Sequence, residues 1–155
     1  MKTMAQQIHS MQRRWPAFNA VPMGRDHMLW FGDLVGIQKR YRVMIEFGLP
    51  SDPLNDPPCR RFPQVRIMNP RLRPNFEAAD EAPLPHVYFD VDDLPNSPLC
   101  LFDPAAGEWS HNDFISLTTV PWTCDWLASY EGWRATGRWF AGGRHATSQL
   151  KQATS

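Results

Sequence analysis

The sequence predicts an α+β fold in which helices pack on one side of an antiparallel sheet. Three observations support this class: a helical apolar pattern at the N-terminus, several short strand-like runs in the first half, and a second helical pattern in the last third. Helices and strands that are segregated along the chain are typical of α+β domains. For a chain of 155 residues we expect one domain, over residues 1–145, and a flexible tail over residues 146–155.

The first helix is predicted to begin near Met4 and to end near Pro16. Apolar side chains recur at helical spacing, at Met4, Ile8, Met11 and Trp15, with polar residues between them. Proline marks the end because it cannot continue the hydrogen-bond ladder of a helix. We expect the apolar stripe to pack on the core, with a partner-binding helix as the alternative.

The strand-like runs predict a meander of three or four antiparallel strands. Residues 28–37 and 41–47 are apolar and are joined by a short polar link, which is typical of a hairpin. Residues 49–58 are rich in Pro, Asp and Asn, so they form a loop. Residues 62–68 give a further strand that begins at Phe62 or Pro63, because proline cannot donate to a ladder.

The last third of the chain is predicted to be helical. We expect a helix to begin at Phe114, with Asn112 or Asp113 as its cap, and to be interrupted at residues 118–121, which end in a proline. Its core face is the set of apolar residues at helical spacing: Trp122, Trp126, Leu127, Tyr130 and Trp133.

Composition narrows the classes of function. The formal net charge is zero, which argues against nucleic acid as the main partner. No run of about twenty apolar residues occurs and the N-terminus lacks the apolar run of a signal peptide, so we expect no membrane span and a cytoplasmic protein. The three cysteines, Cys59, Cys100 and Cys124, form no C-x-x-C pair. In a reducing compartment this favours free thiols, so we expect neither a metal nor a cofactor.

The charges are unevenly distributed along the chain. Arginines are frequent in residues 60–73, where no acid occurs, whereas residues 75–132 contain most of the sixteen acids and no Lys or Arg. The simpler interpretation is two solvated faces that attract each other in the fold. The alternative is a polarised surface that selects and steers a charged partner.

The stretch from residue 86 to residue 109 contains the candidate site. Cys100 follows a loop rich in Pro and Asp, lies between Leu99 and Leu101, and has His86 before that loop. A cysteine between leucines is most often an inert core residue. The loop before it and the turn after it favour exposure instead. We interpret Cys100 as a nucleophile that carries an acyl group as a thioester.

Acidic residues flank this cysteine in the sequence. Nearby carboxylates should raise the pKa of the thiol, whereas a protease-like thiolate needs a lowered pKa. A carrier thiol tolerates a raised pKa because its partner delivers an already activated acyl group. The same carboxylates can deprotonate or orient an attacking amine. The residues concerned are Asp90, Asp92, Asp93 and Asp103.

The order of these residues resembles the ubiquitin-conjugating enzymes. In that family a His-Pro-Asn motif precedes a cysteine in an apolar-Cys-Leu context, a Trp-Ser-Pro follows, and a helix crosses behind. The matching residues here are His86, Leu99-Cys100-Leu101 and Trp109-Ser110. The pattern over residues 99–137 is similar to a bacterial branch, the stand-alone conjugating enzymes of cyclic-oligonucleotide antiphage (CBASS) operons.

This resemblance implies a ubiquitin-conjugating-enzyme-like fold, with Cys100 as the catalytic thiol and His86 orienting the loop by hydrogen bonding. It implies a thioester transferase whose ubiquitin-like substrate is the C-terminus of the operon's nucleotidyltransferase, with an activating enzyme as a possible further partner. Val87 and Tyr88 stand where the family has Pro and Asn, so the usual oxyanion-stabilising Asn is missing from its place. Asn96 is a candidate substitute, and a turn-forming role is the alternative.

Two other functions stay open at this point. One is a binding module of the same fold that holds the partner without chemistry. The other is a small cysteine hydrolase in which Cys100 acts with His86 or His111, although such enzymes usually show a clearer Cys–His–Asp/Asn set. Of the remaining cysteines, we expect Cys124 in the core and Cys59 exposed. Gly142-Gly143 resembles a ubiquitin-like tail, but it is internal, so we expect a turn there.

Overall fold

The computed structural model of the chain describes residues 1–77 and 82–140. The flexible tail predicted for residues 146–155 and the turn predicted at Gly142-Gly143 lie outside the described residues. In chain order, the elements are α1 (Met4–Arg14), β1 (Asn19–Gly24), β2 (His27–Val35), β3 (Arg40–Gly48), α2 (Pro58–Arg61), β4 (Gln64–Asn69), the 3-10 helices η1 (Leu94–Asn96) and η2 (Pro104–Ala106), and α3 (Thr119–Thr136).

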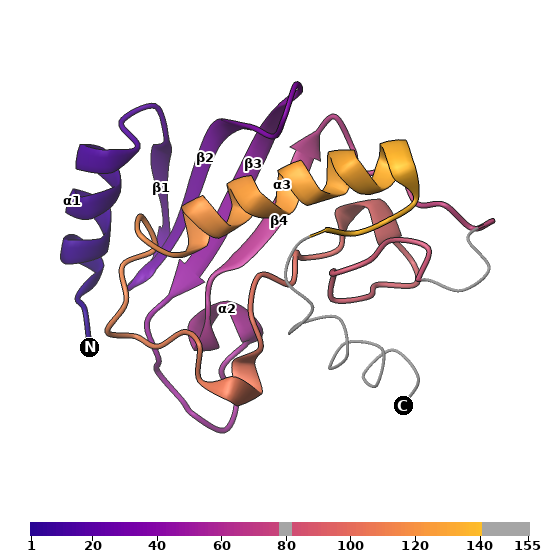
Figure 1. Cartoon of the computed structure of the whole chain (residues 1–155). Coiled ribbons are helices and arrows are strands. Elements are labelled where there is room, and N and C mark those ends of the chain that lie inside the picture. The colour runs from indigo at the N-terminus through magenta and orange to yellow at the C-terminus, as the bar shows by residue number, and fades with distance from the viewer. Residues whose placement is uncertain (78–81, 141–155) are drawn as a thin grey trace.

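The four strands form one antiparallel sheet in the order β1-β2-β3-β4, so each strand pairs with its neighbour in sequence. Helix α3 runs across one face of this sheet, and α1 lies beside β1 (Figure 1). The predicted α+β class, with an N-terminal helix, an antiparallel meander and a C-terminal helix on the sheet, is confirmed.

One strand and one α-helix were not predicted from the sequence. Strand β1 is an exposed edge strand with no alternation of buried and exposed residues, so it carries no period-two pattern. Its Pro22 is typical of an edge strand, where a missing N–H costs no ladder bond. Helix α2 is a single short helix that begins where the predicted Pro-rich loop ends.

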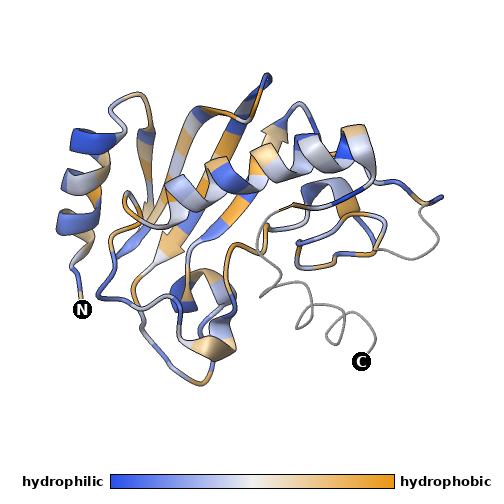
Figure 2. Cartoon of the chain, viewed as in Figure 1, coloured by the Kyte–Doolittle hydropathy of each residue, from blue (hydrophilic) through white to orange (hydrophobic). Residues whose placement is uncertain are grey.

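The core lies between the sheet and α3. In β2 and β3 nearly every second residue is buried, and the register places Trp30 opposite Ile45 and Leu34 opposite Tyr41. This alternation is visible as changing hydropathy along the strands in Figure 2. Because side chains alternate between the two faces of a strand, all four residues lie on the face that α3 covers.

Helix α1 is capped as its sequence allows and is tied to the segment before α3. Thr3 and Gln6 form a capping box, each side chain accepting the other's main-chain N–H. The buried Gln7 side chain donates to the Asp113 carbonyl (2.8 Å) and accepts the Ile115 N–H (3.0 Å). These two bonds satisfy buried main-chain groups that no helix or strand would pair.

Helix α3 begins at Thr119, so the predicted start at Phe114 and the predicted interruption at residues 118–121 are wrong. Pro121 lies in the first turn, where the missing N–H has no partner within the helix in any case. The predicted core face is buried at Trp126, Leu127, Tyr130 and Trp133, and Trp122 is partly buried. Among the described residues, no helix combines the length and apolar character that crossing a membrane requires.

Candidate functional site

Main-chain hydrogen bonds fix the position of Cys100. Its N–H donates to the His86 carbonyl (2.9 Å), and Val87 pairs with Leu99 in an isolated antiparallel bridge. The Leu99 N–H also donates to the carbonyl of Val65 in β4 (2.8 Å). The two segments around residues 86 and 100 therefore pair with each other and are attached to the sheet.

His86 organises this region through its backbone and its ring. Its φ is 55°, a left-handed conformation that few residues other than glycine adopt. Its carbonyl accepts a second hydrogen bond, from Nε1 of Trp126 in α3 (2.8 Å), and its ring stacks on Trp139 with 4.7 Å between ring centroids. The structure thus brings His86 and Cys100 together and connects both to the C-terminal helix.

The Cys100 thiol is enclosed. The residue is 5% exposed, and Sγ donates to the Phe102 carbonyl (3.3 Å). The Phe102 ring contacts the rings of Phe62 (5.4 Å between centroids) and Trp122 (5.8 Å), so the residues next to Cys100 belong to an aromatic cluster. The exposure favoured by the flanking loop and turn is therefore wrong for the resting structure. The segment is extended and lies against the sheet and these rings.

The hydroxyl of Tyr88 lies beside this thiol. The ring packs on Phe62 (5.9 Å between centroids), and the hydroxyl oxygen is buried without a well-aligned hydrogen bond. Burial raises the pKa of Tyr88, and the Cys100 thiol and the Asp103 carboxylate raise it further. The phenol is therefore protonated at neutral pH and is available as a hydrogen-bond donor. In the sequence, Tyr88 was noticeable only as a departure from the family motif.

The carboxylates near Cys100 are engaged in local structure. Asp90 accepts main-chain N–H groups within its own loop, Asp93 pairs with Arg71 (3.0 Å), and Asp103 caps η2. The Arg71–Asp93 pair supports the simpler interpretation of the charge distribution, because it joins the arginine-rich and the acid-rich segments. That these carboxylates raise the pKa of the Cys100 thiol or orient an amine stays a prediction.

A family model described as Type II CBASS E2 protein matches residues 7–146, from within α1 to beyond α3. The chain belongs to the type II CBASS E2 family. The resemblance inferred from His86, Cys100 and Trp109 is thereby confirmed. The family consists of ubiquitin-conjugating-like proteins of a bacterial antiphage system, and membership implies a protein partner in the operon. A comparison with the curated proteins finds no match for the chain.

Two further candidate residues of this E2 protein make other contacts. Asn96 ends η1, where its N–H donates to the Asp93 carbonyl (3.0 Å), and none of its hydrogen bonds within the described residues involves Cys100. This position matches the turn-forming alternative. His111 Nε2 lies 3.0 Å from the Arg60 carbonyl, and its ring contacts two core aromatic residues. None of these contacts supports the hydrolase in which His111 serves as base.

The expectation of an exposed Cys59 is wrong. It is 6% exposed because α2 folds against β3 and places it beside two strand residues, His27 and Glu46. Donor atoms of the three lie within 4.8 Å of one another, a set that a zinc ion can share. Arg66 lies 3.9 Å from the same Glu46 carboxylate and competes with a cation for it. Cys124 is half-buried at the edge of the core.

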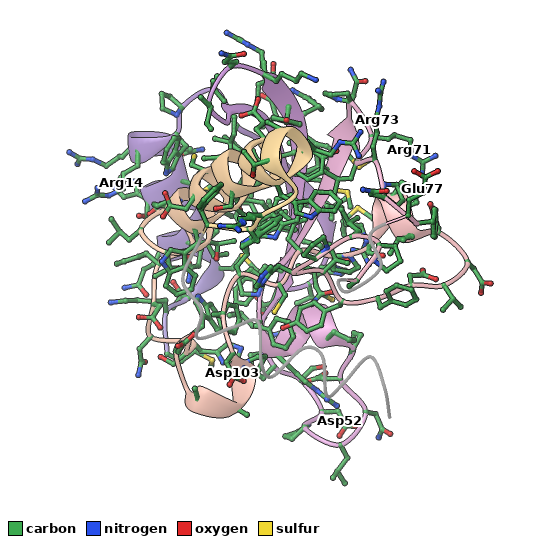
Figure 3. All side chains as sticks on the ribbon, turned by 45° about the vertical axis from the view of Figure 1, so that its right-hand side comes forward. Arg14, Asp52, Arg71, Arg73, Glu77 and Asp103 are labelled. Atoms are coloured by element: carbon green, nitrogen blue, oxygen red, sulfur yellow. The ribbon has the colours of Figure 1, made fainter. Side chains whose placement is uncertain are left out.

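A basic groove lies at the C-terminal end of α3. It has a volume of about 380 Å³, and its lining includes four cationic side chains, two tyrosines and one carboxylate: Lys39, Arg71, Arg73, Arg134, Tyr41, Tyr130 and Glu131. Figure 3 shows Arg71 and Arg73 near each other at one end of the molecule and Asp103 toward the other. The groove keeps open the alternative of a polarised surface that steers a charged partner.

Proposed function

We propose that this E2 protein is a thioester transferase in which Cys100 carries the C-terminal acyl group of a partner protein, the nucleotidyltransferase of its operon. The observation that supports this most is the family match over residues 7–146, which includes Cys100 held by its N–H against the His86 carbonyl. The position of Cys100 after a fixed loop and before α3 corresponds to that of the catalytic cysteine in the family it resembles.

The proposed reaction has two steps. In the first, the Cys100 thiolate attacks the carbonyl carbon of an activated C-terminus, an acyl adenylate or a thioester supplied by an activating enzyme. The S–C bond forms, the carbonyl π pair moves to oxygen, and collapse expels AMP or the donor thiol. In the second, an amine attacks the Cys100 thioester, a C–N bond forms, and the C–S bond breaks. The sulfur leaves with the electron pair and takes up a proton, while the amine loses one.

The burial of Cys100 means that the proposed reaction requires a local change of structure around the sulfur. With only 5% of the residue exposed, the sulfur must be uncovered by a local opening before an acyl donor reaches it. The same observation favours a second candidate function, a binding module of the same fold that holds the nucleotidyltransferase C-terminus without forming a covalent bond.

Incubation with the nucleotidyltransferase, ATP and the activating enzyme separates the two functions. The thioester transferase predicts an adduct on non-reducing gels that dithiothreitol removes and that Cys100→Ala abolishes. Cys124→Ala is the matched control, because it removes a half-buried thiol elsewhere and should leave the adduct unchanged. A stable complex with no adduct on the wild-type protein would identify the binding module instead.

A further inference from the structure

We propose that the Tyr88 hydroxyl is the oxyanion donor of this site and takes the place of the missing Asn of the family motif. The inference rests on the proposed thioester chemistry and adds a catalytic residue to it. When an amine attacks the Cys100 thioester, the carbonyl oxygen becomes negatively charged one bond away from the carbon that is attached to Sγ. A donor beside Sγ is therefore placed where that charge develops.

The backbone pairing places Tyr88 and Cys100 on the same side of their two-stranded ribbon. Val87 pairs with Leu99, and the Tyr88 N–H donates to the Pro98 carbonyl (2.8 Å). Side chains alternate along each segment, so Val87 and Leu99 point to one side, into the core, and Tyr88 and Cys100 belong to the other. Tyr88 and Cys100 are then diagonal neighbours, a separation that an aromatic side chain spans.

The hydroxyl lies beside the sulfur, because the Tyr88 and Cys100 side chains interact directly and the Tyr88 ring is packed on Phe62. Phe62 contacts the Tyr88 ring, and Phe62 in turn contacts Phe102, whose carbonyl accepts the Cys100 thiol. The Tyr88 hydroxyl is buried and lacks a well-aligned hydrogen bond within the described part of the chain. A buried hydroxyl without a good partner costs free energy in the resting protein. Its partner in the resting protein is the Cys100 sulfur, with which a side-chain hydrogen bond contributes to the raised pKa of Tyr88. Sulfur is a weak acceptor, so an oxyanion at Cys100 would supply a stronger one.

The environment suits a donor and not a base. Burial, then the Cys100 thiol and the Asp103 carboxylate, raise the pKa of Tyr88, so the phenol keeps its proton throughout the working pH range. In a site from which water is excluded, a hydrogen bond to a full negative charge is stronger than in solution. The donor thus favours the tetrahedral intermediate over the neutral thioester, which is the requirement for catalysis.

Tyr88→Phe tests the role by removing one oxygen atom. The probe is a short peptide that ends in a glycine α-thioester of mercaptoethanesulfonate; Cys100 takes the acyl group and expels the small thiol. The isolated adduct is then discharged by hydroxylamine, which gives the hydroxamate and free Cys100, and intact mass follows the rate. We expect Tyr88→Phe to slow this discharge by about 100-fold, as for the loss of other oxyanion donors. Failure of Tyr88→Phe to take up the acyl group also supports the role, because uptake passes through an oxyanion.

Alkylation of Cys100 by iodoacetamide is the control reaction, because it needs the same access to the same sulfur but forms no oxyanion. Tyr88→Phe should leave the alkylation rate essentially unchanged. Tyr41→Phe is the matched control variant: it removes another buried hydroxyl without a well-aligned partner, from β3, and should leave discharge unchanged. Unchanged discharge in Tyr88→Phe, or alkylation slowed by the same factor as discharge, would overturn the inference while leaving the thioester function intact.

A second variant decides the matter if Tyr88→Phe does not fold. Replacing Tyr88 by 3-fluorotyrosine keeps the ring and the hydroxyl but makes the phenol more acidic and therefore a stronger hydrogen-bond donor to an oxyanion. Discharge should then be faster than in the wild type while alkylation by iodoacetamide stays unchanged, and unchanged discharge would refute the role of Tyr88. If the wild-type protein takes no acyl group from the probe or from its partner, the proposed function itself fails.

Discussion

Replacing Trp126 by Phe should weaken the connection between α3 and the site. The indole N–H of Trp126 donates to the His86 carbonyl (2.8 Å), which also accepts the Cys100 N–H. Loss of one hydrogen bond costs about 1 kcal/mol. The smaller ring of a residue that is 4% exposed costs a further 1–2 kcal/mol or so, from lost apolar burial and a small cavity. We therefore expect the free energy of unfolding in urea to fall by about 2–3 kcal/mol.

Trp109→Phe is the matched control for this prediction. Trp109 is similarly buried, but its indole N–H has no acceptor in the described part of the chain. Trp109→Phe therefore loses only the stability that comes from burying the larger ring, and it also removes an unsatisfied hydrogen-bond donor. The destabilisation by Trp126→Phe should therefore exceed that by Trp109→Phe by about 1 kcal/mol or more. Equal losses in the two variants would show that the bond to His86 contributes nothing to stability.

Two more predictions concern the sheet and the loop before α2. Gly32→Ala would place a Cβ 2.5 Å from the Phe18 ring, so it should destabilise the protein by about 1–3 kcal/mol in urea unfolding. Part of that loss should be recovered in the double variant with Phe18→Leu; strictly additive losses would mean that the clash is not the cause. Hydrogen bonds from Ser51 hold the pKa of Asp56 below its ordinary value. The ionised carboxylate then stabilises the fold above that ordinary value, and the contribution disappears as the pH falls through the lowered pKa. Asp56→Asn should therefore unfold at lower urea than the wild type at pH 7, and the difference should narrow as the pH falls through the lowered pKa of Asp56. A difference that stays constant into acid would contradict this linkage.

The sequence predicted the elements whose apolar pattern matches their burial. The period of Met4 to Trp15 gave α1, and the hairpin β2–β3 followed from two apolar runs with a short polar link. Strand β1 was not predicted because an exposed edge strand needs no alternation of apolar and polar residues. The start of α3 was misplaced because Pro121 was interpreted as a break, although the first turn of a helix accepts proline.

The candidate site was predictable only in part. The order of His86, Cys100 and Trp109 indicated the family, because these residues lie in one local stretch. The burial of Cys100 is a tertiary property that no local pattern reports: the neighbouring Phe102 packs on Phe62, which lies about forty residues earlier in the chain. The proximity of Tyr88 to Cys100 depends on the pairing of two extended segments across a loop, so sequence spacing alone could not reveal it.

The central claim is that the sulfur of residue 100 becomes acylated by the partner's C-terminus. Cys100→Ser tests it most directly, because a serine in the same place traps the acyl group as an ester that dithiothreitol does not cleave. After incubation with the nucleotidyltransferase, ATP and the activating enzyme, the adduct is digested and mapped by mass spectrometry. The account predicts a branched peptide joined through residue 100, sensitive to dithiothreitol in the wild type and resistant in Cys100→Ser. An adduct that maps to another residue, or a bound partner with no covalent link in either protein, would contradict it.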